Sequence, residues 1–201
     1  MKLTAADRAQ LSAAVNTLEH TGDRRRTAWW LLTGAPGSGK TTLAQRFDEH
    51  GWRVIEDPGR AEFEAQIAKG FSPDAVRSDY LRFQQRVLCR ALSAVMAVPS
   101  DQRAVFDYGI AEALAFMRLS GIPWDDDIVR AAARVQFASV FVLDLVPLDP
   151  LVVDSIRAES VYTRKELLEM IEELYVVLGH QPIRVPALPS EERFRWVLGH
   201  S

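Results

Sequence analysis

GAPGSGKT, residues 34–41, matches every fixed position of the phosphate-binding loop pattern G-x-x-x-x-G-K-[ST], and a further threonine, Thr42, follows it. Glycines let such a backbone curl until successive amide groups point at one anion, next to the positive end of a helix dipole. In this pattern the lysine, Lys40, reaches the β- and γ-phosphates of a nucleotide, and the Thr41 hydroxyl is a ligand for Mg²⁺. The stretch therefore predicts a nucleotide-binding loop. Its residues are Gly34, Ala35, Pro36, Gly37, Ser38, Gly39, Lys40, Thr41 and Thr42.

The segments on either side of this loop have the patterns of a strand and a helix. Residues 27–33, TAWWLLT, form a short apolar run that is rich in aromatic residues and ends at a glycine, which is typical of a buried strand. A helix is expected from Gly39 to about His50, with Gly51 as its stop. A phosphate-binding loop joins a strand to a helix, so these surroundings strengthen the interpretation.

Strand and helix patterns alternate along the rest of the chain. Further strands are expected at residues 52–56, 103–107, 139–143 and 182–185. Helices are expected at 4–22, 72–98, 110–119, 124–134 and 190–198, and another helix follows a polar segment with Arg157 and Arg164 and ends at about residue 178. Short buried strands that alternate with helices imply parallel pairing through crossover connections and a sheet covered on both faces. We predict a three-layer α/β fold.

The composition is that of an ordinary folded domain. The chain has 201 residues, of which 48% are hydrophobic and 25% charged, and it has no apolar run long enough to cross a bilayer. Asp7, Arg8 and Gln10 interrupt the apolar residues near the N-terminus, so no secretory signal is expected. The single cysteine, Cys89, excludes an internal disulfide and fits a reducing compartment. We therefore expect a cytoplasmic protein of one domain, without a membrane partner.

The charge argues against a polynucleotide partner. The formal net charge is −3, whereas a protein that binds nucleic acid mainly through phosphates carries a basic excess. The one basic run, Arg24, Arg25 and Arg26, is either an anion site or a solvated turn before the first strand, and we favour the turn. A small molecule is the expected partner.

Three classes of phosphate-loop protein lack their signatures here. Hydrolytic ATPases have a glutamate beside the aspartate at the strand end, but Asp107 is followed by Tyr108 and Gly109. Guanine-binding proteins show Asn-Lys-x-Asp after a late strand, but residues 142–145 read VLDL. The chain also lacks room for the helical lid domain of an oligomeric motor. Phosphoryl transfer to a small molecule remains, and it depends mainly on positioning and charge neutralisation.

Six segments, taken in their order along the chain, carry a resemblance to a known family. These segments are GAPGSGKTT (34–42), VIEDPGR (54–60), VFDYGIAEALAF (105–116), ASVFVLD (138–144), VVDSIRAES (152–160) and LGHQPIRVPALPSEERFRWVL (178–198). From about residue 30 to 198 the sequence resembles small bacterial ATP-binding proteins labelled AAA-type. These proteins group with the ribosylnicotinamide kinase domain and, more distantly, with deoxynucleoside and thymidylate kinases.

The resemblance implies an organisation for the whole chain. It implies five parallel strands in the order 2-3-1-4-5 and a mobile lid. We expect residues 1–26 to form an N-terminal helical appendage and 27–201 the phosphate-loop domain, with the lid at about 150–165. The family includes kinases of different small molecules, so it does not fix the substrate.

An acidic residue after the second expected strand is a candidate catalytic base. The family pattern has an acidic residue three positions before an arginine, here Asp57 and Arg60. Carboxyl ends of neighbouring parallel strands meet at one crevice, where Asp57 would face the γ-phosphate and accept the proton of an acceptor hydroxyl. Arg60 would hold the acceptor. Glu56 is an alternative base, and a simple turn with Asp57 as its cap is the structural alternative.

The acidic residue after the third expected strand is a candidate for organising Mg²⁺. Asp107 resembles the strand-end acid that acts on the metal through water. The family usually has Asp-Arg-Gly here, whereas this chain has Tyr108 in place of the arginine. Glu112, where relatives often have aspartate, is either a further site residue or a solvated helix residue.

Arginines of the expected lid are candidates for stabilising transferred charge. Arg157, three residues after Asp154, matches the Asp-x-x-Arg of the family's lid, and Arg164 lies further along as a possible substrate contact. An arginine supplied within the chain can stabilise charge on the equatorial oxygens of a phosphoryl group.

The remaining polar residues favour structural roles. Asp144 lies where a purine ring would lodge, without a base-reading pattern. The acids of residues 124–127 are expected to start a helix instead of holding a metal. Cys89 lies on the long helix expected at 72–98 and is expected to be a residue of the protein core and not a nucleophile. The histidines have no spacing that suits a metal and are expected at the surface; they are His20, His50, His180 and His200.

The function expected from these features is transfer of phosphate from MgATP to a small hydroxyl-bearing molecule, with nucleosides as one candidate class. The catalytic residues would be Lys40, Asp57 and Arg157. Two rival interpretations are a nucleotide-dependent switch with little turnover and a small NTPase.

Overall fold

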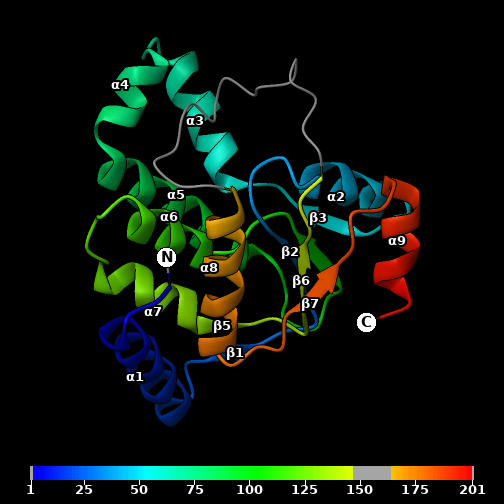
Figure 1. Cartoon of the computed structure of the whole chain (residues 1–201), viewed down its shortest axis with the longest axis horizontal. Helices are drawn as coiled ribbons and strands as arrows, with labels where there is room; N and C mark the ends of the chain where they lie inside the picture. The colour runs from blue at the N-terminus through cyan, green and yellow to red at the C-terminus, as the bar shows by residue number, and fades with distance from the viewer. Residues whose placement is uncertain (1, 147–163, 201) are drawn as a thin grey trace.

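A parallel sheet forms the centre of the computed structural model, which describes residues 2–146 and 164–200 (Figure 1). The five strands lie in the order β3-β4-β2-β6-β7. Their bounds are β2 Trp30–Thr33, β3 Arg53–Ile55, β4 Ala104–Phe106, β6 Ser139–Leu143 and β7 Ile183–Val185. Numbered along the five expected strands, this is the order 2-3-1-4-5, so the expected topology is confirmed.

Helices cover both faces of the sheet, which confirms the three-layer α/β fold (Figure 1). On one face lie α2 and α9; on the other lie α5, α6, α7 and α8. The helix bounds are α1 Ala5–Thr21, α2 Lys40–Glu49, α3 Pro58–Ala68, α4 Pro73–Ser78, α5 Tyr80–Ala97, α6 Ala111–Leu119, α7 Asp126–Arg134, α8 Arg164–Val177 and α9 Ser190–Leu198.

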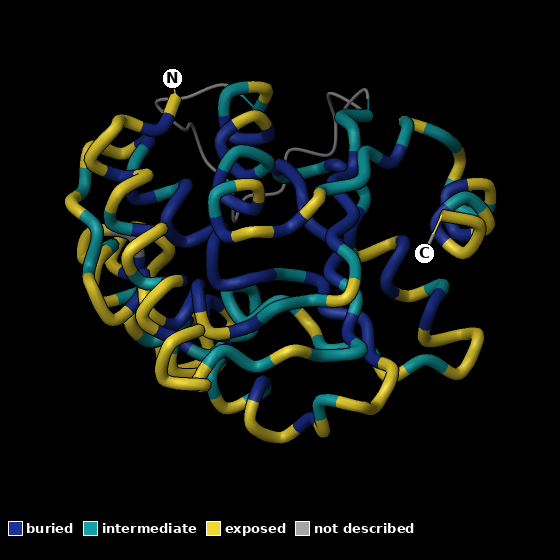
Figure 2. Tube along the Cα trace, turned by 90° about the horizontal axis from the view of Figure 1, so that it is seen from below, coloured by how far each residue is buried: buried dark blue, intermediate teal, exposed yellow. Residues whose placement is uncertain are grey.

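Alternation along β2 divides the core into two clusters. Leu31 belongs to the larger cluster with the buried residues of α6, α7 and α8, whereas its neighbour Leu32 packs with Phe47 of α2 and Val197 of α9. Successive side chains of a strand point to opposite faces, so a fully apolar strand is buried on both sides. In Figure 2 the buried stretches of the chain lie towards the interior and the exposed stretches on the outside.

The first helix packs against the rest of the core. Thr4 and Asp7 form a capping box at its N-terminus, and Gly22, with φ of 74°, ends it, as the sequence predicts. Its inward residues Leu11 and Leu18 join the larger core cluster, and α1 contacts α7. The N-terminal helix therefore shares its apolar face with the main domain.

The region between β3 and β4 differs from the expectation. The single helix expected at 72–98 is wrong, because Asp79 (φ −116°, ψ 70°) ends α4 and caps α5 by accepting from the Arg82 amide. Helix α3 was not expected. Its inward face carries the buried polar residues Glu62 and Gln66, so its sequence lacks an apolar stripe.

The expectation of a solvated turn at Arg24–Arg26 is also wrong. Arg25–Arg26 form strand β1, which pairs in parallel with β5, Val135–Gln136. The Arg25 guanidinium donates to the carbonyls of Val95 (2.6 Å) and Val98 (2.7 Å), and Arg24 donates to a backbone carbonyl of Leu178. These side chains join the ends of helices, so the basic run is structural.

The expected positions of Cys89 and His180 are wrong, whereas the expected helix start at residues 124–127 is confirmed. Cys89 is exposed, because it lies on the outer side of α5 and not on the side that carries Val87 and Ala91. His180 is buried, whereas His20, His50 and His200 are exposed as expected. Asp125 caps α7 by accepting from the amides of Asp127 and Ile128, so the acidic cluster does start a helix.

Two searches of the described residues found nothing. None of their helices is both long and apolar enough to span a membrane. Among residues 2–146 and 164–200, no group of three or more histidine, cysteine, aspartate or glutamate side chains could hold a metal ion.

Candidate functional site

The phosphate-binding loop leaves the end of β2 and enters α2, as the sequence predicts. Gly34 has φ of 142°, and a Cβ there would lie 2.9 Å from the carbonyl oxygen of Leu143. Gly39, with φ of 86°, is the N-cap of α2 and adopts the left-handed conformation that glycine favours. The loop therefore depends on glycine at both ends, one for close backbone approach and one for the turn into the helix.

Lys40 lies folded over the loop that precedes it. Its side chain is 9% exposed, and its ammonium donates to the carbonyl oxygens of Gly34 (2.8 Å) and Ala35 (3.2 Å). The positive charge is therefore held at the concave side of the loop, next to the N-terminus of α2. The arrangement favours an anion at this point.

Thr41 and Asp107 meet across two elements. The Thr41 hydroxyl, in the first turn of α2, donates to Oδ2 of Asp107 (2.7 Å), and Asp107 is 2% exposed. Asp107 follows β4, and its amide donates to the carbonyl of Ile55 (2.9 Å), so the backbone is fixed beside β3. A hydroxyl and a carboxylate are oxygen ligands of the kind that Mg²⁺ prefers. These two residues fit the metal that a phosphate-loop protein uses.

Arg193 supports the loop from α9, a role that no motif of the sequence predicts. It is 3% exposed, and its guanidinium donates to the carbonyls of Pro186 (2.8 Å), Ser38 and Asp144 (3.0 Å). Burial lowers the pKa of Arg193. One side chain therefore fastens the loop to the segments that follow β6 and β7. In the sequence, its position beside the apolar residues of a short amphipathic helix is the one feature that could have indicated a buried arginine.

The acids after β3 lie in different environments. Asp57 is the N-cap of α3, and its Oδ1 accepts from the amides of Gly59 (2.8 Å) and Arg60 (3.4 Å). Its Oδ2 has no hydrogen-bond partner among the described residues. Glu56 is exposed, and Arg60 lies half-buried in the first turn of α3. The capping geometry fits the structural alternative for Asp57 and leaves one carboxylate oxygen for other use.

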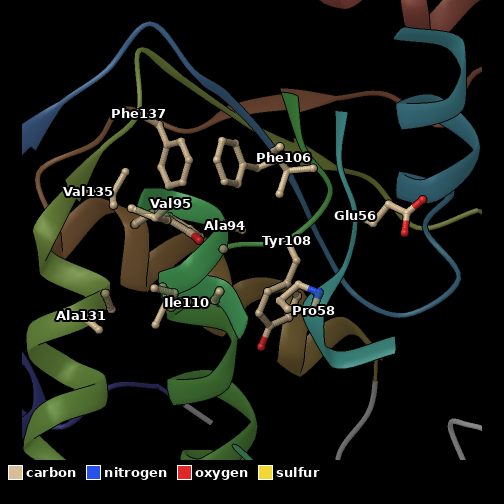
Figure 3. A pocket seen from close by; sticks show the side chains of 16 residues that line it. Glu56, Pro58, Ala94, Val95, Phe106, Tyr108, Ile110, Ala131, Val135 and Phe137 are labelled. Atoms are coloured by element: carbon tan, nitrogen blue, oxygen red, sulfur yellow. The ribbon is translucent and has the colours of Figure 1, made fainter. Parts of the chain in front are cut away.

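A small apolar cavity lies between the ends of β3 and β4 and the helices α5, α6 and α7 (Figure 3). Its volume is about 20 Å³, which is enough for about one water molecule. Phe106 and Phe137 line it, with ring centroids 5.7 Å apart, and Tyr108 lies among the lining residues nearer β3. Glu56 also borders it, with a carboxylate that points away from the apolar side chains in Figure 3.

Arg164 lies beside the phosphate-binding loop at the start of α8. Its Nε donates to the carbonyl of Pro36 (2.8 Å), and another guanidinium nitrogen donates to that of Val146 (3.2 Å). The other lid arginine, Arg157, lies outside the described residues, as does Asp154. Of the two arginines expected in the lid, Arg164 is the one within the described residues, and it lies next to the loop.

Two further candidates have partners that sequence reasoning did not foresee. Asp144 accepts from Arg184 (2.9 Å), which also bonds Glu172 on α8. Glu112 is 2% exposed and lies beneath the loop, so the interpretation of it as a solvated helix residue is wrong. Burial raises the pKa of Glu112 to about 7.

The fold and this site define the class of protein. The chain has an α/β P-loop NTPase-like fold with a five-stranded parallel sheet, and a P-loop domain of this kind implies nucleotide binding. A family profile described as "AAA domain" matches residues 29–193, so the chain belongs to this AAA-domain family. No curated protein matches the sequence.

Solved structures of one kinase share the fold. The chain is similar to deoxyadenosine kinase from M. mycoides with the products dCMP and a flexible dCDP, with a TM-score of 0.56 and 15% identity over 86% of this chain and 97% of that one. It is also similar to that enzyme with bound dATP, with a TM-score of 0.55 and 14% identity over 86% and 98% of the two chains. Identity at this level shows a deoxynucleoside-kinase-like fold and nothing about the substrate.

Proposed function

We propose that this protein transfers the γ-phosphate of ATP to a hydroxyl group of a small molecule. The observation that carries the proposal is the contact between Thr41 and Asp107, with the Lys40 ammonium at the concave side of the same loop. These groups supply a charged cradle for the phosphates and two oxygen ligands for Mg²⁺. They lie at the edge of the sheet where β3 and β4 also end, which is where an acceptor would have to lie to meet the γ-phosphate.

Lys40 would hold the nucleotide in the proposed reaction. Its ammonium would exchange the carbonyl oxygens of Gly34 and Ala35 for phosphate oxygens, which carry more negative charge. Thr41 and Asp107 would hold Mg²⁺, which neutralises charge on the β- and γ-phosphates when bound. Arg193 keeps the loop in place during these exchanges, because its partners are backbone carbonyls that the nucleotide does not need.

Asp57 would act as the general base. Its Oδ1 is fixed by the amides of Gly59 and Arg60, which leaves Oδ2 for the proton of the acceptor hydroxyl. The acceptor oxygen then forms a bond to the γ-phosphorus while the bond from that phosphorus to the β–γ bridging oxygen breaks, and ADP leaves. Arg60, in the same turn, would bind the acceptor. Glu56 is the alternative base, because it is exposed at the end of the same strand.

Arginines from the lid would stabilise the charge that develops during transfer. Arg164 supports this assignment by its position, since it already bonds the carbonyl of Pro36 in the loop. Arg157 is proposed for the same task on its match to the lid pattern. Closure of the lid would exclude water and favour the acceptor hydroxyl over hydrolysis.

A nucleoside is one candidate for the acceptor. The similar structures are of a deoxyadenosine kinase, with products or nucleotides bound. A specific observation favours the rival interpretation of a switch with little turnover: Tyr108 lies beside a cavity of about 20 Å³, at the position where the resembled family usually has an arginine. The acceptor therefore has to fit a site without that arginine.

The test is whether ADP formation depends on an acceptor. Purified protein would be incubated with MgATP and a panel of nucleosides and other small alcohols. The proposal expects ADP to form at least about tenfold faster with one acceptor than without any. Equal rates with and without every acceptor would favour the NTPase, and no measurable turnover together with tight ATP binding would favour the switch.

A further inference from the structure

A buried carboxyl group lies beneath the phosphate-binding loop. Glu112, the second residue of α6, has three hydrogen-bond donors around it. The Thr33 hydroxyl and the Gly109 amide (3.1 Å) donate to its Oε1, and the Tyr175 hydroxyl donates to its Oε2 (2.7 Å). Each oxygen of the carboxyl group is therefore engaged.

The three donors come from the segments that build the site. Thr33 is the last residue of β2 and directly precedes Gly34 of the loop. Gly109 lies two residues after Asp107. Tyr175 belongs to α8, which begins at Arg164 beside the loop. One carboxyl group thus joins the loop, the Asp107 segment and the helix that follows the lid.

The side chains around the Glu112 carboxyl group are tightly packed. A Cβ on Gly109 would lie 1.9 Å from the Tyr175 hydroxyl and 3.0 Å from Oε2 of Glu112. Tyr175 is 2% exposed and lies in the larger core cluster. An ionisable group in such a place costs stability, and an apolar residue of similar volume would often be less costly. The cluster therefore does something that apolar packing would not.

We propose that Glu112 is a positioning residue for the phosphotransfer site, which fixes the spacing between the phosphate-binding loop and the Asp107 segment. The inference rests on the proposed function. The Thr41–Asp107 hydrogen bond joins the same two segments inside the site, but it would be lost if both side chains bound Mg²⁺. The Glu112 bonds do not involve Thr41 or Asp107, so they would persist and hold the two residues at the right separation in the loaded protein.

The experiment compares four variants. In Glu112→Ala, the donors from Thr33, Gly109 and Tyr175 lose their acceptor. Glu112→Gln keeps an acceptor oxygen for Thr33 and Gly109 and places an amide group towards the Tyr175 hydroxyl. Tyr175→Phe removes a single donor and keeps the packing. The matched control is Asp7→Asn, which alters another buried carboxylate: that of Asp7 accepts from the Thr4 amide in the capping box of α1 and from Arg118 in the last turn of α6.

Two readouts are measured for each variant: kcat and KM for ATP with the best acceptor, and the ratio of the ATP Kd values without and with Mg²⁺. Misplacement of reacting groups by about 1 Å costs on the order of a hundredfold in rate. For Glu112→Ala we expect kcat to fall between about tenfold and a hundredfold, KM for ATP to change less than about threefold, and the Mg²⁺-dependent gain in affinity to shrink at least about fivefold. Glu112→Gln should stay within about threefold of wild type, and Tyr175→Phe should fall between the two.

The outcomes separate this inference from the proposed function. If wild type shows no acceptor-dependent turnover, the proposed function fails, and the Mg²⁺-dependent ratio still decides whether Glu112 positions the site. If wild type turns over and Glu112→Ala keeps both its kcat and its Mg²⁺-dependent ratio, the inference is overturned. An equal loss in Asp7→Asn would also overturn it, because the effect would then be one of general stability. If Glu112→Ala does not fold, unchanged values in Tyr175→Phe would overturn it.

Discussion

On the nucleotide side of the sheet edge, the charged groups already have partners: Lys40 bonds two carbonyls of the loop, and Thr41 bonds Asp107. On the acceptor side, between β3 and β4, Glu56 is exposed and the adjacent cavity measures only about 20 Å³. The charged groups of the proposed nucleotide side are thus already placed by hydrogen bonds, whereas under the proposed function an acceptor would need more room than this cavity provides. Affinity for ATP is expected to depend on the first region and the choice of acceptor on the second.

The largest effect is expected on the nucleotide side, from Lys40→Ala. Loss of the ammonium should lower turnover by about a thousandfold, because the phosphate charge loses its main fixed partner. The same variant should lose the rise in melting temperature that ATP gives the wild type; a ligand at a hundred times its Kd stabilises by about 2.7 kcal/mol. Thermal unfolding with and without MgATP measures this.

Lys165→Ala is the matched control for Lys40→Ala, since Lys165 lies exposed near Glu169 on α8. It should keep the ATP-dependent rise in melting temperature. A full ATP-dependent rise in Lys40→Ala would contradict the assignment of the loop as the nucleotide site.

The acceptor side should respond to Asp57→Asn with a loss of chemistry and not of binding. Asparagine keeps an oxygen that can cap α3, so the fold should persist. Acceptor-dependent turnover should fall about a hundredfold, the scale of a lost general base, while the Kd for MgATP stays within about threefold. Steady-state kinetics and calorimetric titration measure the two quantities. A larger loss of turnover in Glu56→Gln than in Asp57→Asn would assign the role of general base to Glu56.

The pH dependence of stability tests two buried groups, Glu112 beneath the phosphate-binding loop and His180 just after the end of α8. Burial raises the pKa of Glu112 to about 7 and lowers the pKa of His180 to about 4. Between pH 4.5 and 6.5 the unfolded chain releases the Glu112 proton while the folded chain keeps it, so this group makes stability fall as the pH rises. The unfolded chain keeps the His180 proton that the folded chain has lost, so His180 makes stability rise over the same range.

The two contributions oppose each other at roughly 3 kcal/mol each, from about 1.36 kcal/mol per pKa unit. Glu112→Gln should therefore gain stability relative to wild type as the pH rises from 4.5 to 6.5, and His180→Gln should lose it. Urea unfolding at both pH values measures the difference. If both variants follow the wild-type pH dependence, the buried carboxyl and imidazole do not titrate as their surroundings require.

The smallest effect is expected from Arg193→Met, which disturbs the nucleotide side from below. Its removal leaves the carbonyls of Ser38, Asp144 and Pro186 without their donor. ATP affinity should fall about tenfold, equivalent to about 1.4 kcal/mol, because the loop loses its preorganisation. Arg195→Met is the control on the same helix, since the Arg195 side chain is largely exposed and bonds only Glu191 among the described residues. Equal ATP affinities in the two variants would show that Arg193 does not support the nucleotide-binding loop.

Local patterns predicted most of the fold. The loop motif identified β2 and α2, and apolar runs located strands such as Ser139–Leu143 with the observed bounds. The Thr4–Asp7 capping box and the acids of residues 124–127 marked helix starts correctly, because these signals act within the first turn of a helix. The strand order came from the resemblance to a family and not from the pattern itself.

Contacts between distant residues were beyond such patterns. Glu112 and Tyr175 are 63 residues apart, and Arg193 and Ser38 are 155 apart, so nothing local marks either pair. Helix α3 escaped prediction because buried Glu62 and Gln66 replace apolar residues on its inward face. The candidate site could be predicted as far as its motif residues, whereas the side chains that support them emerge only from the folded chain.

The most direct test of the central claim follows the γ-phosphate itself. ATP labelled at the γ-position would be incubated with the protein, Mg²⁺ and the acceptor panel, and the labelled products would be separated and identified by mass spectrometry. Phosphotransfer predicts the label on the hydroxyl oxygen of one acceptor, with little in inorganic phosphate and none in the Lys40→Ala variant. Label found only in inorganic phosphate, at a rate that no acceptor changes, would contradict it.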